Sequence, residues 1–127
     1  AASNNSLDLL GDLKIAGLLQ KQHYGDARRL PVGELLGAAT AAGHDFFGTG
    51  AGRVVEGAVA DLILVDLDHP SMVPCHELSS NLVYAGGAGA IRHVLCAGRL
   101  VVRDRSVAGS AEILREARAR AAGLARL

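Results

Sequence analysis

Residues 60–67, Ala-Asp-Leu-Ile-Leu-Val-Asp-Leu, form the strongest predicted strand in the chain. An apolar run with an acidic residue near each end is typical of a strand that is buried on both faces. We therefore expect other parts of the protein to lie on both sides of this strand. Asp61, at its entry, is expected to bind backbone amides.

Downstream of this strand the pattern predicts a short helix over residues 76–84 and then a hairpin. Two β-rich runs, residues 91–96 and 99–103, flank the short turn Ala97-Gly98, which is typical of paired antiparallel strands. Ser110 is a favourable cap for a last helix, whose apolar positions recur at helical spacing.

Upstream, the sequence predicts two helices before any strand. The first runs from Leu7 to about His23, with Asn5 as its N-cap, and the second runs from Pro31 to Thr40. Gly43 is expected to interrupt before a helical turn over residues 44–47. A glycine-rich turn at residues 48–52 then leads to a short strand, residues 53–55. It follows a helix and opens a strand, which is the reverse of a nucleotide-binding glycine loop.

These elements make an awkward free-standing fold. Half of the 127 residues are apolar, yet a few short strands offer too little sheet to cover two apolar helices. The chain also begins without an initiator Met and without a signal-peptide pattern. We therefore expect it to be part of a larger body that continues upstream of Ala1.

Composition excludes several classes of function. Lys plus Arg and Asp plus Glu both number 13, so there is no general basic surface for nucleic acid. The arginines at 115, 118, 120 and 126 are interpreted as a solvated helix face. No apolar run approaches the about 20 residues of a membrane-spanning helix. Cys75 and Cys96 are expected to be free thiols in a reducing cytoplasm.

The residues alone predict no catalytic group. Five histidines are present, but none has a His-x-His or His-Glu-x-x-His spacing, and there is no Gly-x-Ser-x-Gly. Asp61 and Asp66 fall on opposite faces of the predicted strand, so they cannot act as a pair. Two hypotheses remain open at this point: a fragment of a larger enzyme, or an interaction module with exposed apolar helix faces.

Six segments, in order, resemble metal-dependent amidohydrolases of the chlorohydrolase and aminohydrolase branch, and most closely the 5′-methylthioadenosine/S-adenosylhomocysteine deaminases. The resemblance extends from residue 1 to about residue 107. The segments are Ala1–Leu9, Ala39–Gly43, Gly52–Val54 with Glu56–Gly57, Ala60–Leu62, Ser80–Ala85 and Val94–Arg99.

The resemblance implies an α/β fold: the last part of a (β/α)₈ TIM barrel plus the C-terminal portion of a small β-sandwich domain. Residues 1–50 are then the end of the barrel, residues 51–109 the sandwich strands and hairpin, and residues 110–127 a C-terminal helix. In that fold the missing sandwich strands come from N-terminal residues.

The resemblance also implies hydrolytic deamination of an adenine-type nucleoside or related N-heterocycle, with release of ammonia. One divalent metal, expected to be zinc, lowers the pKa of its water to about 7 and so supplies hydroxide at neutral pH. Its ligands are all expected upstream of Ala1, so no catalytic or metal-binding residue is predicted here. Ser3, Asn4 and Asn5 are candidates for the pocket mouth, or serve only as loop and helix cap.

Expected partners are the rest of the same polypeptide, a small-molecule substrate and further copies in a homo-oligomer, with no nucleic acid and no membrane. Within the branch, guanine or oxidised-purine deaminases and triazine hydrolases remain alternatives, because substrate-reading residues in such barrels lie mostly on upstream loops. A non-catalytic interaction module is the alternative outside the branch.

Overall fold

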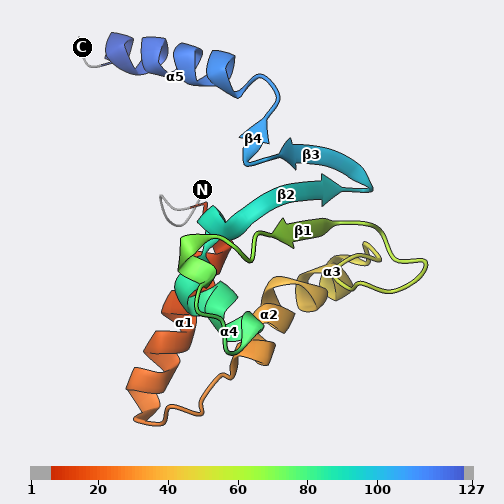
Figure 1. The fold of residues 1–127 in the computed structure, drawn as a ribbon, viewed down its shortest axis with the longest axis vertical. Helices are drawn as coiled ribbons and strands as arrows, with labels where there is room; N and C mark the ends of the chain where they lie inside the picture. The colour runs from red at the N-terminus through yellow and green to blue at the C-terminus, as the bar shows by residue number, and fades with distance from the viewer. Residues whose placement is uncertain (1–6, 125–127) are drawn as a thin grey trace.

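The computed structural model describes residues 7–124. Three helices come first, and a four-stranded antiparallel sheet of order β1-β2-β3-β4 follows, with a last helix beyond it (Figure 1). The fold of the described residues is therefore mixed α/β, as the sequence predicts. The helices lie on one side of the sheet, and the last helix stands at its far end.

Helix α1 (Leu9–Tyr24) begins two residues later than predicted. Its N-cap is Asp8, whose carboxylate accepts a hydrogen bond from the Gly11 N–H at 3.1 Å. The prediction that Asn5 caps this helix is therefore wrong, because Asp8 is the cap. Asn5 itself lies outside the described residues. Gly25 ends the helix in the left-handed conformation, at φ 62°, as its position after the apolar pattern indicates.

Helices α2 (Val32–Ala39) and α3 (Ala41–Phe47) follow with Thr40 between them. Pro31 precedes α2 as its N-cap residue, because a proline there gives up no intrahelical bond. The prediction that Gly43 interrupts the helical segment is wrong, since Gly43 lies inside α3. Gly48 then ends α3 at φ 65°, again in the left-handed conformation.

The small core lies where α1, α2 and the segment after α4 (Leu78–Asn81) meet. Leu13, Leu35 and Val83 are its buried members, at 7%, 2% and 2% exposure. Six partly buried side chains surround them: Leu10, Leu30, Val32, Leu36, Ala39 and Tyr84. The core therefore joins the first two helices to residues that come almost 50 positions later in the chain.

Residues 53–55 are not a strand, so this prediction is wrong. Val54 and Val55 are 87% and 61% exposed, and Arg53 turns away to pair with Asp45 of α3. Two adjacent valines have high β propensity, but a strand needs a neighbour with which to exchange backbone hydrogen bonds. The predicted turn at Glu56–Gly57 is present.

Strand β1 (Leu62–Val65) is shorter than predicted and lies at the edge of the sheet. It pairs only with β2 (Ile91–Cys96), and Ile63 and Leu64, on its two faces, are each 45% exposed. The prediction of a strand buried on both faces is therefore wrong for the described residues. The apolar run that suggested it is present, but nothing among residues 7–124 covers both of its faces.

Four short elements connect β1 to β2. A 3-10 turn η1 (Pro70–Met72) is followed by α4, a π-helical turn η2 (Leu82–Gly86) and a second 3-10 turn η3 (Ala88–Ala90). The predicted helix over residues 76–84 thus splits into α4 and η2. Glu77 caps α4, because its carboxylate accepts hydrogen bonds from the backbone of Ser79 and Ser80.

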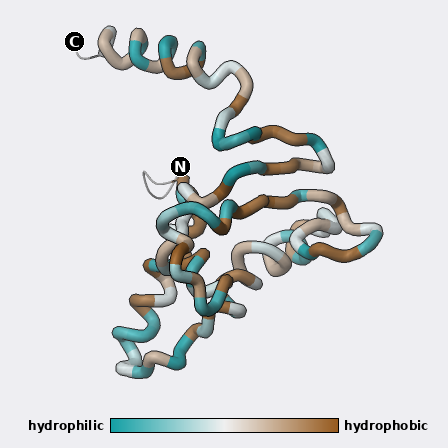
Figure 2. The backbone as a smooth tube through the Cα atoms, in the orientation of Figure 1, coloured by the Kyte–Doolittle hydropathy of each residue, from teal (hydrophilic) through white to brown (hydrophobic). Residues whose placement is uncertain are grey.

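The predicted hairpin is confirmed at both strands. β2 and β3 (Arg99–Arg103) pair in the register Leu95↔Leu100 and Cys96↔Arg99, around the turn Ala97-Gly98. A two-residue strand β4 (Ser106–Val107), which the sequence did not predict, extends the sheet beyond β3. Apolar stretches run along β1, β2 and β3 in Figure 2.

Helix α5 (Ser110–Leu124) begins at the predicted serine and stands apart from the other helices (Figure 1). Every residue from 111 to 123 is exposed, including Ile113 at 61% and Leu114 at 53%. Its apolar face therefore packs against nothing within the described residues. Among the helices described, none combines the length and hydropathy that crossing a bilayer requires.

The chain exposes far more surface than its size explains. A compact monomer of 13.1 kDa has roughly 6,400 Å² of accessible surface, whereas this chain has 9390 Å². The surplus of roughly 3,000 Å² is of the size that obligate protein interfaces cover, about 2,000 Å² and above. The expectation that the chain belongs to a larger body is thus supported by its area.

Candidate functional site

A cleft of 490 Å³ lies between the helices and the sheet. Its walls are mostly apolar and come from both parts of the chain. They are Leu9 and Leu10 of α1, Leu36 and Ala39 of α2, Leu82 of η2, and Leu62, Ile63, Ile91, Val94 and Leu95 of the first two strands. The remaining lining residues are Thr40, His44, Gly52, Arg53, Val54, Asp61 and Cys96.

The hydrogen-bonding side chains at this cleft already have partners within the chain. Thr40 Oγ1 donates to the Leu36 carbonyl at 2.7 Å, and His44 Nδ1 lies 2.5 Å from Thr49 Oγ1. The Arg53 guanidinium makes two bonds of 2.7 Å to the Asp45 carboxylate. The cleft therefore offers apolar contact area rather than groups positioned for acid–base or nucleophilic chemistry.

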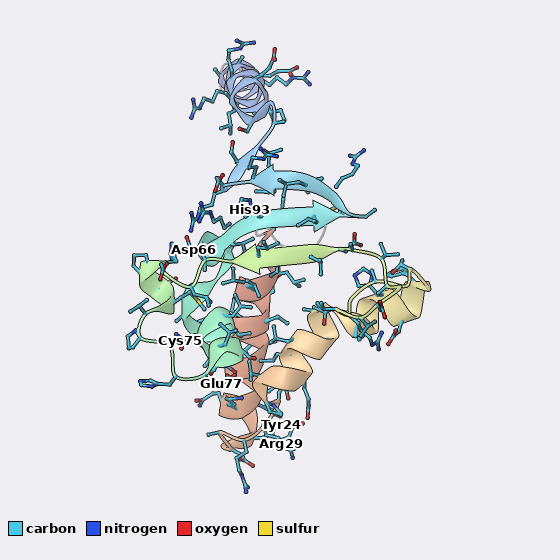
Figure 3. All side chains as sticks on the ribbon, turned by 45° about the vertical axis from the view of Figure 1, so that its right-hand side comes forward. Tyr24, Arg29, Asp66, Cys75, Glu77 and His93 are labelled. Carbon is cyan, nitrogen blue, oxygen red and sulfur yellow. The ribbon has the colours of Figure 1, made fainter. Side chains whose placement is uncertain are left out.

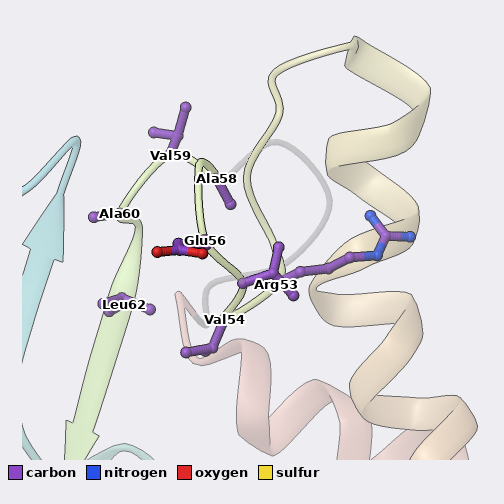
Figure 4. Close-up of a pocket in the computed structure, with 8 residues that line it drawn as sticks. Arg53, Val54, Glu56, Ala58, Val59, Ala60 and Leu62 are labelled. Carbon is purple, nitrogen blue, oxygen red and sulfur yellow. The ribbon is translucent and has the colours of Figure 1, made fainter.

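A smaller hollow of 240 Å³ lies between β1 and the loop that precedes it (Figure 4). The Glu56 carboxylate lies between the loop and the strand, while the Arg53 side chain extends away toward the helices. The arginine is held there by Asp45, and this ion pair lowers the pKa of the Asp45 carboxyl. One carboxylate without a neighbouring acid or base does not make a reaction centre.

Asp61 anchors the turn of the β2–β3 hairpin. Its Oδ1 accepts a hydrogen bond from the Ala97 N–H at 2.6 Å, and the adjacent Gly98 N–H donates to the Ala60 carbonyl at 2.9 Å. The prediction that Asp61 binds backbone amides at the strand entry is therefore confirmed. Its role among the described residues is structural, because this bond joins the residue before β1 to the turn between β2 and β3.

Arg105 links three segments at the opposite end of β1. Its guanidinium donates to Asp66 Oδ2 at 2.6 Å and to the Gly89 carbonyl at 3.1 Å, and its N–H donates to the Arg92 carbonyl at 2.9 Å. The bond from Arg105 holds the pKa of Asp66 below its ordinary value. Asp66 and His93 lie near one another at this end of the sheet in Figure 3.

Asp104, next to this link, is bound by two side chains of β2. Arg92 Nε donates to Asp104 Oδ1 at 2.7 Å, and His93 Nδ1 accepts from the Asp104 N–H at 3.2 Å. The bond from Arg92 lowers the pKa of the Asp104 carboxyl. Arg92, His93 and Asp104 thus already have partners at the β3–β4 turn.

The described residues do not fit a metal site. Residues 7–124 contain no group of three or more His, Cys, Asp or Glu side chains that could hold a metal ion. His44, His69 and His93 bind Thr49, Ser71 and the Asp104 N–H, in three separate places. Cys75 and Cys96 are both free and exposed. The metal that the sequence resemblance implies therefore has no ligand group among residues 7–124.

The pocket-mouth candidates Ser3, Asn4 and Asn5 lie outside the described residues, so their role stays a prediction. Sequence reasoning missed Arg105 and Lys21. Lys21 Nζ donates to the carbonyls of Arg29 and Leu30, at 2.6 and 3.1 Å. The only local signal for Lys21 and Arg105 was a basic side chain close to a turn. Their hydrogen-bond partners lie in other segments and come within reach only when the chain folds.

The chain is similar to part of several known proteins. The model of the amidohydrolase family matches residues 1–101. The 5′-deoxyadenosine deaminase of Methanoregula boonei is 46% identical over 125 residues, which is 98% of this chain but 28% of that protein. The 5-methylthioadenosine/S-adenosylhomocysteine deaminase 1 of Archaeoglobus fulgidus is 46% identical over 102 residues, which is 80% of this chain and 24% of that protein.

Among solved structures, a zinc-bound adenosine deaminase from Xanthomonas campestris matches 99% of this chain with a TM-score of 0.89 and 32% identity. The chain covers 30% of that structure, so it spans less than a third of the proteins that it resembles. The segments that carried the resemblance in the sequence all lie within the residues matched by the family model. On this agreement of sequence and fold, the chain belongs to the amidohydrolase family.

Proposed function

We propose that this chain is the C-terminal section of a metal-dependent deaminase that acts on an adenine nucleoside with an altered 5′ position. The observation that carries the proposal is the 46% identity to a 5′-deoxyadenosine deaminase along 98% of the chain. The relatives with methylthioadenosine and S-adenosylhomocysteine in their names extend the substrate class to adenosines without a free 5′-hydroxyl. The reaction replaces the exocyclic amino group of the adenine with oxygen from water and releases ammonia.

In this proposal the chain contributes support rather than chemistry. A metal, when bound by upstream residues, supplies an activated water. The described residues contain no set of ligands for this metal, and we assign them no step of the reaction. What they offer is a set of apolar faces, because α1, α5 and β1 all expose large apolar side chains.

We further propose the division of the chain that the family fold implies. Residues 1–50 form the last part of a (β/α)₈ barrel, residues 51–109 part of a small β-sandwich, and residues 110–127 a C-terminal helix. Support comes from three features: the free edge of β1, the exposure of Ile63 and Leu64 on its two faces, and the surplus surface. A second sheet supplied by upstream residues accounts for all three.

Two finer proposals concern the pocket and the assembly. Ser3, Asn4 and Asn5 precede α1 in the sequence and are proposed to line the pocket mouth, which predicts that Asn4→Ala in the full-length enzyme raises KM. An unchanged KM would contradict a pocket role for Asn4 and leave it as a loop residue before the Asp8 cap. The enzyme is also proposed to be a homo-oligomer, which light scattering on the full-length protein tests directly.

The decisive experiment is an ammonia-release assay on the full-length protein. 5′-Deoxyadenosine, 5′-methylthioadenosine and S-adenosylhomocysteine are expected to be deaminated, and removal of the metal with a chelator is expected to abolish the reaction until zinc is restored. Guanine and a chlorinated triazine serve as comparison substrates. Preference for either of them assigns the protein to another activity of its family.

The metal question has a separate test. The coding sequence upstream of Ala1 is expected to contain a His-x-His, a later histidine and an aspartate two residues before Ala1. A full-length sequence without these residues contradicts the proposed mechanism, whatever the assay shows. Metal analysis of the purified protein then distinguishes an inactive preparation from a protein that never binds metal.

A further inference from the structure

We draw no further inference here: the strongest candidate, the exposed apolar face of α5 formed by Ile113, Leu114, Ala117 and Ala121 beyond the far end of the sheet, carries nothing because nothing within residues 7–124 shows what covers it.

Discussion

Ala97 occupies a backbone conformation that an alanine rarely adopts. Its φ is 48°, and Gly98 beside it is at φ 76°, so both turn residues of the β2–β3 hairpin are left-handed. Such a turn favours Asn-Gly or Gly-Gly, because a Cβ in this region costs about 1–2 kcal/mol. The Asp61 carboxylate binds the Ala97 N–H and offsets part of this strain.

Replacing this alanine is expected to stabilise the protein. Ala97→Asn should raise the free energy of unfolding of the full-length protein by about 0.5–1 kcal/mol, because asparagine tolerates the left-handed region. Ala97→Val should lower it, since a β-branched residue is strained there. Urea unfolding of the two variants checks the prediction. Equal shifts in the same direction would show that the turn relaxes to another conformation.

Gly17 of α1 faces the ring of Tyr84. A Cβ at this glycine would lie 2.8 Å from the Tyr84 hydroxyl and 2.9 Å from Leu35 Cδ1, and Leu35 is 2% exposed. Gly17→Ala is therefore expected to destabilise the full-length protein by about 1–3 kcal/mol through overpacking. Gly37→Ala, in α2, is the control. Apart from its own helix backbone and chain neighbours, no atom lies within 4 Å of the added Cβ, and alanine has a higher helix propensity than glycine.

The Tyr84 hydroxyl is expected to contribute little to stability. It is buried and has no hydrogen-bond partner among the described residues. Tyr84→Phe is therefore expected to leave stability within about 0.5 kcal/mol of the original or to raise it, since no bond is lost. In the double variant with Gly17→Ala, the closest contact disappears and part of the loss is recovered. Denaturation midpoints of the single and double variants measure this coupling.

At the residue scale, the sequence predicts contacts that act over one turn and misses those that depend on the fold. Gly25 was predicted to end α1 because a glycine directly after a helical pattern accepts the left-handed conformation. For Asp61 the sequence indicated the kind of partner, a backbone amide, but not the Ala97 N–H itself, which lies 36 positions away. Arg105 binds Asp66 across 39 positions of the chain, and no local pattern encodes that distance. The burial of Tyr84 against Gly17 is of the same kind, since only folding brings the two together.

Lys21 holds the connection between α1 and α2. Leu30, directly before Pro31, has a left-handed backbone at φ 48°. Lys21 Nζ donates to the carbonyls of Arg29 and Leu30, which flank the Leu30 Cα. A bulky residue in this region persists only where its surroundings enforce it. The Tyr24 ring adds a contact at the same loop, with the Arg29 guanidinium 4.5 Å from its centroid (Figure 3).

Lys21→Met is expected to destabilise this connection by about 1 kcal/mol or more, because the apolar stem is kept while the charged donor is lost. Lys14→Met, on an exposed position of the same helix, is the matched control and should have little effect. Hydrogen exchange of the amides in the loop after Gly25 reports the local opening. Equal protection in both variants would contradict an anchoring role for Lys21.

The link between β1 and the β3–β4 turn should depend on pH. The hydrogen bond from Arg105 places the folded-state pKa of Asp66 below the unfolded value of about 3.9. A carboxylate shifted downward adds stability that is complete above the unfolded pKa and is lost as the pH falls through the folded-state pKa. Arg105→Gln should therefore cost stability at neutral pH, and its difference from the original protein should shrink on acidification.

The comparison needs unfolding curves between about pH 7 and about pH 3. Arg99→Gln removes the same charge from the same hairpin without touching Asp66, so its stability difference is expected to show a weaker pH dependence. High salt should reduce the Arg105 effect, because both partners are partly exposed. An Arg105→Gln difference that stays constant over the whole range would contradict the assigned pKa shift.

At the element scale, the sequence predicts elements that are stabilised locally. The hairpin and helices α1, α2 and α5 were predicted because turn residues, caps and helical spacing act within a few positions. The strand predicted at residues 53–55 is absent because β propensity alone does not supply a neighbouring strand with which to pair. β4 was missed because two residues carry no detectable pattern, and its pairing with β3 depends on the left-handed turn at Asp104 and Arg105.

The whole molecule explains both the failed prediction for β1 and the absence of a catalytic group from the described residues. The run Leu62–Val65 was expected to be buried on both faces, yet β1 is an edge strand, and Ile63 and Leu64 are each 45% exposed. Ordered family segments indicated an amidohydrolase even though no reactive group was recognisable. No site could be assigned in detail from the sequence, because residues 7–124 bring no group of three or more potential metal ligands together.

The surplus surface gives the last prediction. Six apolar residues are buried among residues 7–124, namely Leu13, Leu35, Ala51, Met72, Val83 and Ala90. With so few buried residues and roughly 3,000 Å² of excess surface, the isolated chain is expected to bury too little apolar area to offset its conformational entropy. The isolated chain is expected to bind a hydrophobic dye, to aggregate and to unfold without a cooperative transition, whereas the full-length protein unfolds cooperatively. Calorimetry and dye fluorescence on both proteins make the comparison. A compact monomer that melts sharply by itself would instead favour an independent interaction module, because its exposed faces would then need no cover from an upstream barrel.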